Sequence, residues 1–224
     1  PGAPADILDA CGRTVSAALV GSTETPNPVT CEGTVVWTYR YTACDGTTTA
    51  DWTHTYTVDY SGGLTPPAAG SSTVSCPADA TDPGAPADIL DACGRTVSAV
   101  LVGSTETPNP VTCEGTVVWT YRYTACDGTT TADWTHTYTV DYSGGLTPPA
   151  NTNATVSCPA DATDPGAPAD ILDACGRTVS SVLVGSTETP NPVTCEGTVV
   201  WTYRYTACDG TTTADWTHTY TVDY

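Results

Sequence analysis

TVVWTYRYTACDGTTTADWTHTYTVDY, residues 116–142, alternates between apolar and polar residues in two runs, 116–125 and 134–142. A period of two residues is the pattern of a β-strand that buries one face. The segment CDGTTTAD between the runs is rich in turn-forming residues, so the stretch predicts a long antiparallel hairpin. The residues expected to share one face of it are Val117, Trp119, Tyr121, Tyr123 in the first run and Trp134, His136, Tyr138, Val140 in the second.

Two further segments, 72–78 and 97–105, have the composition of additional strands. Between the strands lie the stretches PNP, SGGLTPP and DPGAP, whose proline and glycine residues are incompatible with helix. No segment has the periodicity of an amphipathic helix. Short strands, frequent turns and about 80 residues per core predict an all-β fold of small β-sandwich domains in tandem, arranged as an extended array.

The sequence repeats with a period of 82 residues, because PGAPADILDACGRTVS begins at Pro1, Pro83 and Pro165. The blocks 1–60, 83–142 and 165–224 differ only at two small apolar positions. The connectors between them, 61–82 and 143–164, differ only where AGSS is replaced by NTNA. A recognition site usually needs one specialised copy, whereas a spacer needs equal ones. The near identity therefore favours a structural array.

The chain has 25 acidic residues against six basic ones, which gives a formal net charge of −19. This charge argues against nucleic acid as a partner, because binding phosphate needs a basic patch. It argues equally against an anionic membrane surface. No apolar run approaches the roughly 20 residues that a membrane-spanning helix needs, so no membrane insertion is expected.

Eleven cysteines at fixed spacings in small units predict structural disulfides and an oxidising, extracellular location. A zinc site needs closely spaced pairs, and no two cysteines lie closer together than Cys31 and Cys44 do. We therefore expect no metal site among the cysteines.

The sequence contains no recognisable catalytic, cofactor-binding or metal-ligating set, so neither an enzyme nor a cofactor is expected. His54, His136 and His218 alternate in register with Trp and Tyr, which is typical of packed strand histidines. Calcium is the one cation partner that the acidic charge would tolerate well. Its candidate ligands near the domain junctions are Asp59, Asp79 and Asp82, although no EF-hand spacing is present.

The pieces CPADAT, DACG, CEGTVVWTYRYTACDG and DWTHTYTVDY, in this order, resemble the HYR-like domain with four cysteines. The resemblance covers the whole chain and implies immunoglobulin-like modules in tandem, of the kind found in secreted Bacteroidetes-type bacterial surface adhesins. It implies no catalytic residues. With that family's boundaries, residues 1–60 form an incomplete repeat lacking its first strand, and 65–142 and 147–224 form complete repeats.

Four cysteines in a repeat allow three pairings, and reach excludes one, because Cys113 and Cys126 flank an extended stretch. We expect Cys93–Cys126 with Cys76–Cys113; the alternative, Cys93–Cys113 with Cys76–Cys126, stays open. The other repeats would then contain Cys175–Cys208, Cys158–Cys195 and Cys11–Cys44, with Cys31 unpaired. A rival is a strand-exchange polymer, in which each connector completes the repeat before it and Cys76 bonds Cys31.

These observations predict a structural section of an extracellular bacterial surface fibre or adhesin stalk, stiffened by disulfides. Its partners would be further copies of the same repeat in the chain or fibre. Isopeptide cross-links are excluded because the chain has no lysine. The alternative is a binding module that recognises glycans or another protein through its loops or sheet faces. Such a module should have one divergent copy, which this sequence lacks.

Overall fold

The structure is a computed structural model that describes residues 1–224, and its elements are almost all strands. The first repeat contains β1 (Ile7–Leu8), β2 (Thr14–Val15), β3 (Ala17–Thr25), β4 (Gly33–Thr42) and β5 (Thr49–Val58). The second contains β6 (Gly70–Val74), the 3₁₀ turn η1 (Pro77–Asp79), β7 (Ile89–Leu90), β8 (Thr96–Val97), β9 (Ala99–Thr107), β10 (Gly115–Thr124) and β11 (Thr131–Val140). The third contains β12 (Thr152–Val156), η2 (Pro159–Asp161), β13 (Ile171–Leu172), β14 (Thr178–Val179), β15 (Ser181–Thr189), β16 (Gly197–Thr206) and β17 (Thr213–Val222). The expected all-β class with tandem repeats is confirmed.

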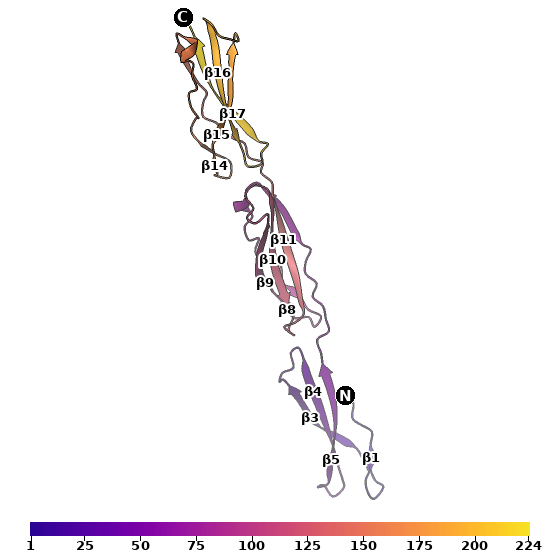
Figure 1. Cartoon of the computed structure of the whole chain (residues 1–224). Helices are drawn as coiled ribbons and strands as arrows, with labels where there is room; N and C mark the ends of the chain where they lie inside the picture. The colour runs from indigo at the N-terminus through magenta and orange to yellow at the C-terminus, as the bar shows by residue number, and fades with distance from the viewer. The chain divides into compact units, whose positions relative to one another are not determined.

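In each repeat the long strands lie side by side as one sheet (Figure 1). The predicted hairpin is present: β4 pairs with β5 and β16 with β17, antiparallel and in unbroken register from Gly33↔Val58 to Thr42↔Thr49 in the first repeat. The strand before the hairpin, β3 or β15, pairs antiparallel with its first strand and contains one irregularity in register, before Gly21 or Gly185.

The strand from each connector joins the sheet of the repeat that follows it in the chain. β6 pairs with β11, and β12 with β17, so the complete sheets have the orders β6-β11-β10-β9 and β12-β17-β16-β15. This pairing is parallel, which the alternation pattern did not reveal. The first repeat has no such strand, and its sheet is β3-β4-β5.

A two-stranded ribbon packs on one face of each sheet and forms the second layer of a small core. In the third repeat, Val179 and Ile171 of the ribbon contact a cluster with Tyr203, Tyr205 and Trp216 of the sheet. The aromatic face predicted from the sequence is the buried one, since Tyr123 and Tyr205 are 0% exposed.

In each complete repeat, the connector packs against a second cluster of buried residues. In the second repeat, Ala80 packs with Val111, Val117 and Val140, and the Trp119 Nε1–H donates to the Ala80 carbonyl at 3.0 Å. Val140 is 1% exposed, whereas its counterpart Val58, in the repeat without a connector, is 37% exposed. The connector strand and its 3₁₀ turn therefore complete the core of the repeat that they precede.

The chain divides into two compact units whose boundary passes through the second repeat. Unit 1 consists of residues 1–68, 85–101 and 121–134, and unit 2 of residues 69–84, 102–120 and 135–224. Each unit therefore contains one junction between consecutive repeats. No helix of the chain has the length and apolar character needed to cross a bilayer.

Candidate functional site: the junctions between repeats

The cysteines fall into four groups by their place in the repeat. The turn cysteines follow the first ribbon strand, and the loop cysteines precede the first hairpin strand. The hairpin cysteines lie at the hairpin turn, and the connector cysteines follow the connector strand. In this order the groups are Cys11, Cys93 and Cys175; Cys31, Cys113 and Cys195; Cys44, Cys126 and Cys208; and Cys76 and Cys158.

Every disulfide in the structure joins one repeat to the next. Two of them bond a loop cysteine to the hairpin cysteine of the following repeat: Cys31–Cys126 and Cys113–Cys208, with Cα–Cα distances of 5.8 and 5.7 Å. The third, Cys76–Cys175, bonds a connector cysteine to the turn cysteine of the following repeat, at 5.5 Å. These spacings match ordinary disulfide geometry. Cys11, Cys44, Cys93, Cys158 and Cys195 are free and exposed.

This arrangement corrects the expected pairing within repeats. Cys126 and Cys208 bond Cys31 and Cys113, not Cys93 and Cys175, and Cys76 bonds Cys175, not Cys113. The expected bonds Cys158–Cys195 and Cys11–Cys44 are not formed, and Cys31 is not unpaired. The strand-exchange bond between Cys76 and Cys31 is absent as well.

Within the repeat, the side chain that lies beside the hairpin cysteine is an arginine, and the cysteine within bonding distance of it is the loop cysteine of the preceding repeat. The turn and the hairpin do meet at one end of the repeat, as expected, since Cys11 and Cys44 line the same cavity. However, the Arg13 guanidinium contacts the Cys44 sulfur, and that of Arg95 contacts the Cys126 sulfur. The bonding partner of Cys126 is the loop cysteine of the preceding repeat.

The loop cysteine is positioned by a buried valine and a glutamate two and seven residues before it. In the second repeat, the Glu106 carboxylate accepts the Val111 backbone N–H at 2.8 Å, and the Val111 side chain is in the core. The corresponding bond, from the Val193 backbone N–H to the Glu188 carboxylate, measures 2.9 Å. These contacts fix the backbone just before Cys113 and Cys195.

The hairpin cysteine is positioned by an aspartate that caps its turn. Asp127 accepts hydrogen bonds from the Thr130 hydroxyl and backbone N–H, at 2.6 and 2.9 Å, and from Thr129. The Thr130 side-chain bond, with these backbone bonds, lowers the pKa of Asp127 to about 2. The counterparts Asp45 and Asp209 also have pKa values of about 2 for the same reason.

We expect the protein to lose stability in acid between about pH 4 and pH 2. A carboxyl whose pKa falls from 3.8 when unfolded to about 2 when folded stabilises the fold above pH 4. That stability is lost as the pH falls through the folded pKa. Thermal unfolding followed by circular dichroism should give similar melting temperatures at pH 7 and pH 5 and lower ones below pH 4.

The variant with Asp45, Asp127 and Asp209 all changed to Asn isolates this effect. It should lose less of its melting temperature between pH 5 and pH 2 than the unchanged chain does. The same number of Glu→Gln changes at the exposed Glu32, Glu114 and Glu196 serves as the control. An unchanged acid response of the Asn variant would contradict the assignment.

The turn between the two strands of each ribbon holds an arginine against an aspartate. The Asp91 Oδ1 accepts the backbone N–H groups of Cys93 and Arg95, each at 2.9 Å, and its Oδ2 accepts the Arg95 Nε–H at 2.8 Å. Burial raises the pKa of Asp91, but these hydrogen bonds and the charge of Arg95 outweigh it, so the pKa lies below its usual value. Asp91 therefore stays charged and anchors Arg95.

The anchored arginine reaches across to the preceding repeat. Arg95 Nη1 donates to the Thr30 carbonyl, and its guanidinium lies over the Tyr60 ring, 5.6 Å from the centroid. Arg177 repeats both contacts, with the Thr112 carbonyl and, at 5.2 Å, with Tyr142. Cation–π contacts of this kind contribute about 0.5–2 kcal/mol each. This role of the arginine was not predicted from the sequence, although an Arg follows Cys-Gly in every repeat.

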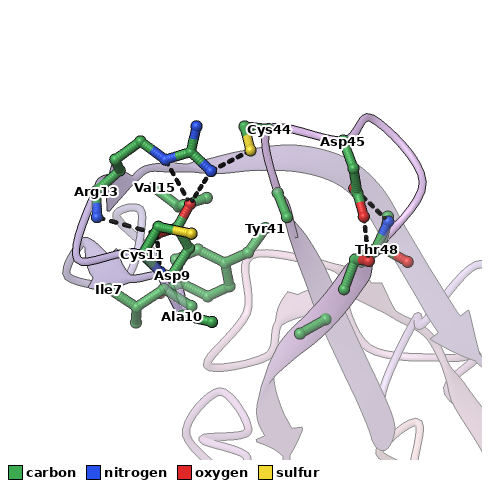
Figure 2. Close-up of a pocket in the computed structure, with 13 residues that line it drawn as sticks. Ile7, Asp9, Ala10, Cys11, Arg13, Val15, Tyr41, Cys44, Asp45 and Thr48 are labelled. Atoms are coloured by element: carbon green, nitrogen blue, oxygen red, sulfur yellow. Dashed lines mark hydrogen bonds and ion pairs between the residues drawn. The ribbon is translucent and has the colours of Figure 1, made fainter.

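The same end of the first repeat is open (Figure 2). A cavity of about 370 Å³ lies beside Asp9, Arg13, Cys11 and Cys44, with mostly apolar walls. Ile7, Val15 and Tyr41 line it, and their counterparts in the third repeat, Ile171, Val179 and Tyr205, pack together with Leu146 of the connector. Figure 2 shows the Arg13 guanidinium between the Asp9 carboxylate and the Cys44 sulfur.

The family of the chain follows from a comparison with protein-family models. The model described as the HYR-like domain with four cysteines matches residues 1–58, 64–140 and 146–222. The chain belongs to this family. No curated protein matches it. The second and third HYR-like repeats each contain all four cysteine groups, and the first contains three.

The remaining candidate residues of the HYR-like repeats lie apart from the junction chemistry. His136 and His218 lie on the hairpin next to Tyr138 and Tyr220, with ring centroids 4.6 and 4.5 Å apart. The Asp82 carboxylate accepts the Gly84 N–H at 2.9 Å, within its own turn. Nowhere in the chain do three or more His, Cys, Asp or Glu side chains meet as a metal site would require, and Asp59 and Asp79 are no exception.

A glycine makes the close approach between two HYR-like repeats possible. A Cβ at Gly144 would collide with the Ala174 Cβ of the next turn and lie 3.0 Å from the Tyr142 hydroxyl. A Cβ at the adjacent Gly145 would meet nothing within 4 Å. Gly144 therefore allows the chain leaving the hairpin to pass against the turn that contains Cys175.

We expect Gly144→Ala to destabilise the protein by about 1–3 kcal/mol, the usual cost of overpacking. Gly145→Ala is the matched control and should have almost no effect, because its methyl group enters open space. Urea unfolding monitored by tryptophan fluorescence measures both variants. Equal unfolding midpoints for the two variants would show that the contact with Ala174 is not tight.

Proposed function

We propose that this chain is a structural section of an extracellular bacterial surface fibre or adhesin stalk, in which disulfides bind consecutive HYR-like repeats together. The role is mechanical and not catalytic. The observation that supports it most directly is that all three disulfides cross a junction between repeats and none closes a loop within one repeat.

The direction of these bonds supports a load-bearing role. A disulfide within a repeat stabilises that repeat only, whereas a disulfide between repeats carries tension from one to the next. Disulfides of this number are typical of secreted and extracellular proteins, where the environment is oxidising. The three repeats are nearly identical, and the same arginine–tyrosine contact occurs at each junction. This uniformity supports a role as a spacer in which every repeat has the same function.

The surface chemistry supports the same proposal. Each of the six arginines forms an ion pair with an aspartate, so the 19 remaining acidic residues give the surface a strong negative charge. Such a surface keeps a long repeat array soluble and resists non-specific association. The cross-strand pairs, such as Arg122 with Asp133 at 2.6 Å, are about 40% exposed and add little stability.

The test is electron microscopy of the native assembly with a gold-labelled antibody against residues 83–142. Because the repeats are nearly identical, the antibody should bind at regular intervals along filaments outside the cell. Protease treatment of intact cells should remove the signal. Labelling confined to the cell interior, or to isolated particles without filaments, would overturn the proposal.

A further inference from the structure

The guanidinium beside the bridge between the first two repeats lies closer to one sulfur than to the other. Arg95 Nη2 contacts the sulfur of the hairpin cysteine, Cys126, and lies 3.9 Å from that of the loop cysteine, Cys31. In the first repeat Arg13 Nη2 contacts the sulfur of the hairpin cysteine Cys44 in the same way. The positive charge is therefore placed on the hairpin side of the bridge.

In the third repeat the same guanidinium nitrogen has no partner. Arg177 Nη2, the counterpart of the atoms that contact Cys44 and Cys126, is buried and forms no hydrogen bond. Buried donors are seldom left unpaired, and an exception calls for an explanation such as a redox role. A negatively charged sulfur at the hairpin cysteine Cys208 is an acceptor that would satisfy this donor.

The arginine is held from both repeats by contacts other than the bridge. The Arg95 guanidinium forms an ion pair at 2.8 Å with Asp91 of its own turn. From the preceding repeat it contacts the Thr30 carbonyl and the Tyr60 ring. These contacts would keep the guanidinium beside the hairpin sulfur when the disulfide is open.

The arginine is the charge that distinguishes the two sulfurs of a bridge. A carboxylate residue follows each of them in the sequence, Glu32 after Cys31 and Asp127 after Cys126, so the sequence neighbours are alike. An adjacent arginine stabilises a thiolate. In thiol–disulfide exchange the better stabilised thiolate is the better leaving group, which is here the hairpin sulfur.

We propose that Arg95 and Arg177 give these bridges a fixed direction of exchange, in which the loop cysteine accepts a small-molecule thiol such as glutathione. At the second junction the incoming thiolate attacks the Cys113 sulfur and forms a mixed disulfide there. Cys208 leaves as a thiolate held by Arg177. The inference rests on the proposed function and deepens it, because it names the reaction that opens and closes the bonds between repeats.

Closure of the bridge is the reverse sequence and needs a small-molecule disulfide such as oxidised glutathione. The Cys113 thiolate attacks this disulfide, forms the mixed disulfide and releases one glutathione thiolate. The Cys208 thiolate then attacks the Cys113 sulfur and releases the second. Two cysteine thiols are oxidised to one disulfide while one glutathione disulfide is reduced to two thiols, so atoms and electrons balance. The arginine stabilises charge and transfers no proton.

Access and charge make opposite predictions for which sulfur is attacked. The hairpin cysteines Cys126 and Cys208 are exposed, whereas the loop cysteines Cys31 and Cys113 are half-buried. Access alone would direct a thiol to the hairpin sulfur, and the guanidinium directs it to the loop sulfur. The position of the first glutathione adduct therefore separates the two explanations.

Cleavage after arginine makes this position measurable at the second junction. Peptide 96–122 contains Cys113 as its one cysteine, and peptide 205–224 contains Cys208. The free thiols of the full chain are first alkylated, and reduced glutathione is then added briefly and quenched with acid. Mass spectrometry of the digest should find glutathione on peptide 96–122 in about fivefold excess over peptide 205–224, the size expected of one charge contact at a partly exposed site.

Substitution of the arginine tests the cause of this excess. Arg177→Gln leaves both diagnostic peptides intact and should abolish the excess or reverse it in favour of Cys208, whereas Arg177→Lys keeps a cation and should keep most of it. Arg40→Gln is the matched control, because it removes the same charge from an arginine that pairs with Asp51 on a hairpin of the first repeat. It should leave the excess unchanged.

Three results would overturn the proposal: attack mainly on Cys208 in the unchanged chain, an excess that survives Arg177→Gln, or an excess lost as fully with Arg177→Lys or Arg40→Gln. Each of them would leave the fibre proposal standing, because the filament labelling does not depend on the direction of exchange. Failure to find filaments would reject the fibre and leave the measured direction of exchange as it is.

Discussion

When a single chain with its three disulfides intact is pulled by its two ends, its contour length should be only about 200 Å, against about 750 Å after reduction. The disulfides force the load along a short path. It runs along residues 1–31, crosses to Cys126, returns to Cys113, crosses to Cys208 and continues to residue 224. This path contains about 60 residues at about 3.3–3.6 Å each.

Force spectroscopy of the full chain measures this contour length directly. Disulfides within repeats would leave about 120 residues on the path and give about 400 Å, so the two pairings are well separated. Cys11→Ser with Cys93→Ser serves as the control and should leave the length at about 200 Å, because both cysteines are free. An oxidised length near 400 Å would contradict the bonds between repeats.

Breaking the single bridge between the first two repeats should cause the largest loss of stability of any single disulfide removal. Cys31–Cys126 closes a segment of 95 residues, and a loop of that size corresponds to about 4–5 kcal/mol in the chain-entropy account. We expect Cys31→Ser with Cys126→Ser to lower the melting temperature by about 10 °C, since each kcal/mol moves a chain of this size by about 2–4 °C.

The control for this prediction has the same number and type of substitutions. Cys11→Ser with Cys44→Ser removes two exposed free thiols and should leave the melting temperature within about 2 °C, since exposed substitutions seldom cost more than about 0.5 kcal/mol. Differential scanning calorimetry compares the two variants. If the control variant melts as low as the first, the loss comes from the cysteine sites themselves and not from the bridge.

Much of the fold could be predicted because its signal is local. The alternation of TVVWTYRYTA places Tyr121 and Tyr123 on one face of a strand whatever surrounds it, and both are buried. The turn between the hairpin strands could also be predicted, from its Asp and Gly residues. The direction of the connector strand could not be predicted, because the parallel pairing of β6 with β11 depends on contacts between segments about 66 residues apart.

The disulfides could not be predicted for a reason particular to repeats. Every cysteine occurs at the same place in each copy, so spacing alone cannot tell whether the partner of Cys126 lies in its own repeat or in the one before. The expected pairing kept each bond within one repeat, which led to Cys93. The structure instead puts Arg95 beside the sulfur of Cys126 and bonds that sulfur to Cys31.

The bond that connects each repeat to its predecessor also constrains how such a gene can change in length. Gain or loss of one whole 82-residue unit leaves every bonding rule intact, because the new neighbours present the same thiols at the same places. A deletion that removes one cysteine of a bonded pair, such as Cys113, leaves the thiol of its partner, Cys208, unpaired at the junction. The number of units can therefore change by recombination between the near-identical units without the loss of any disulfide partner.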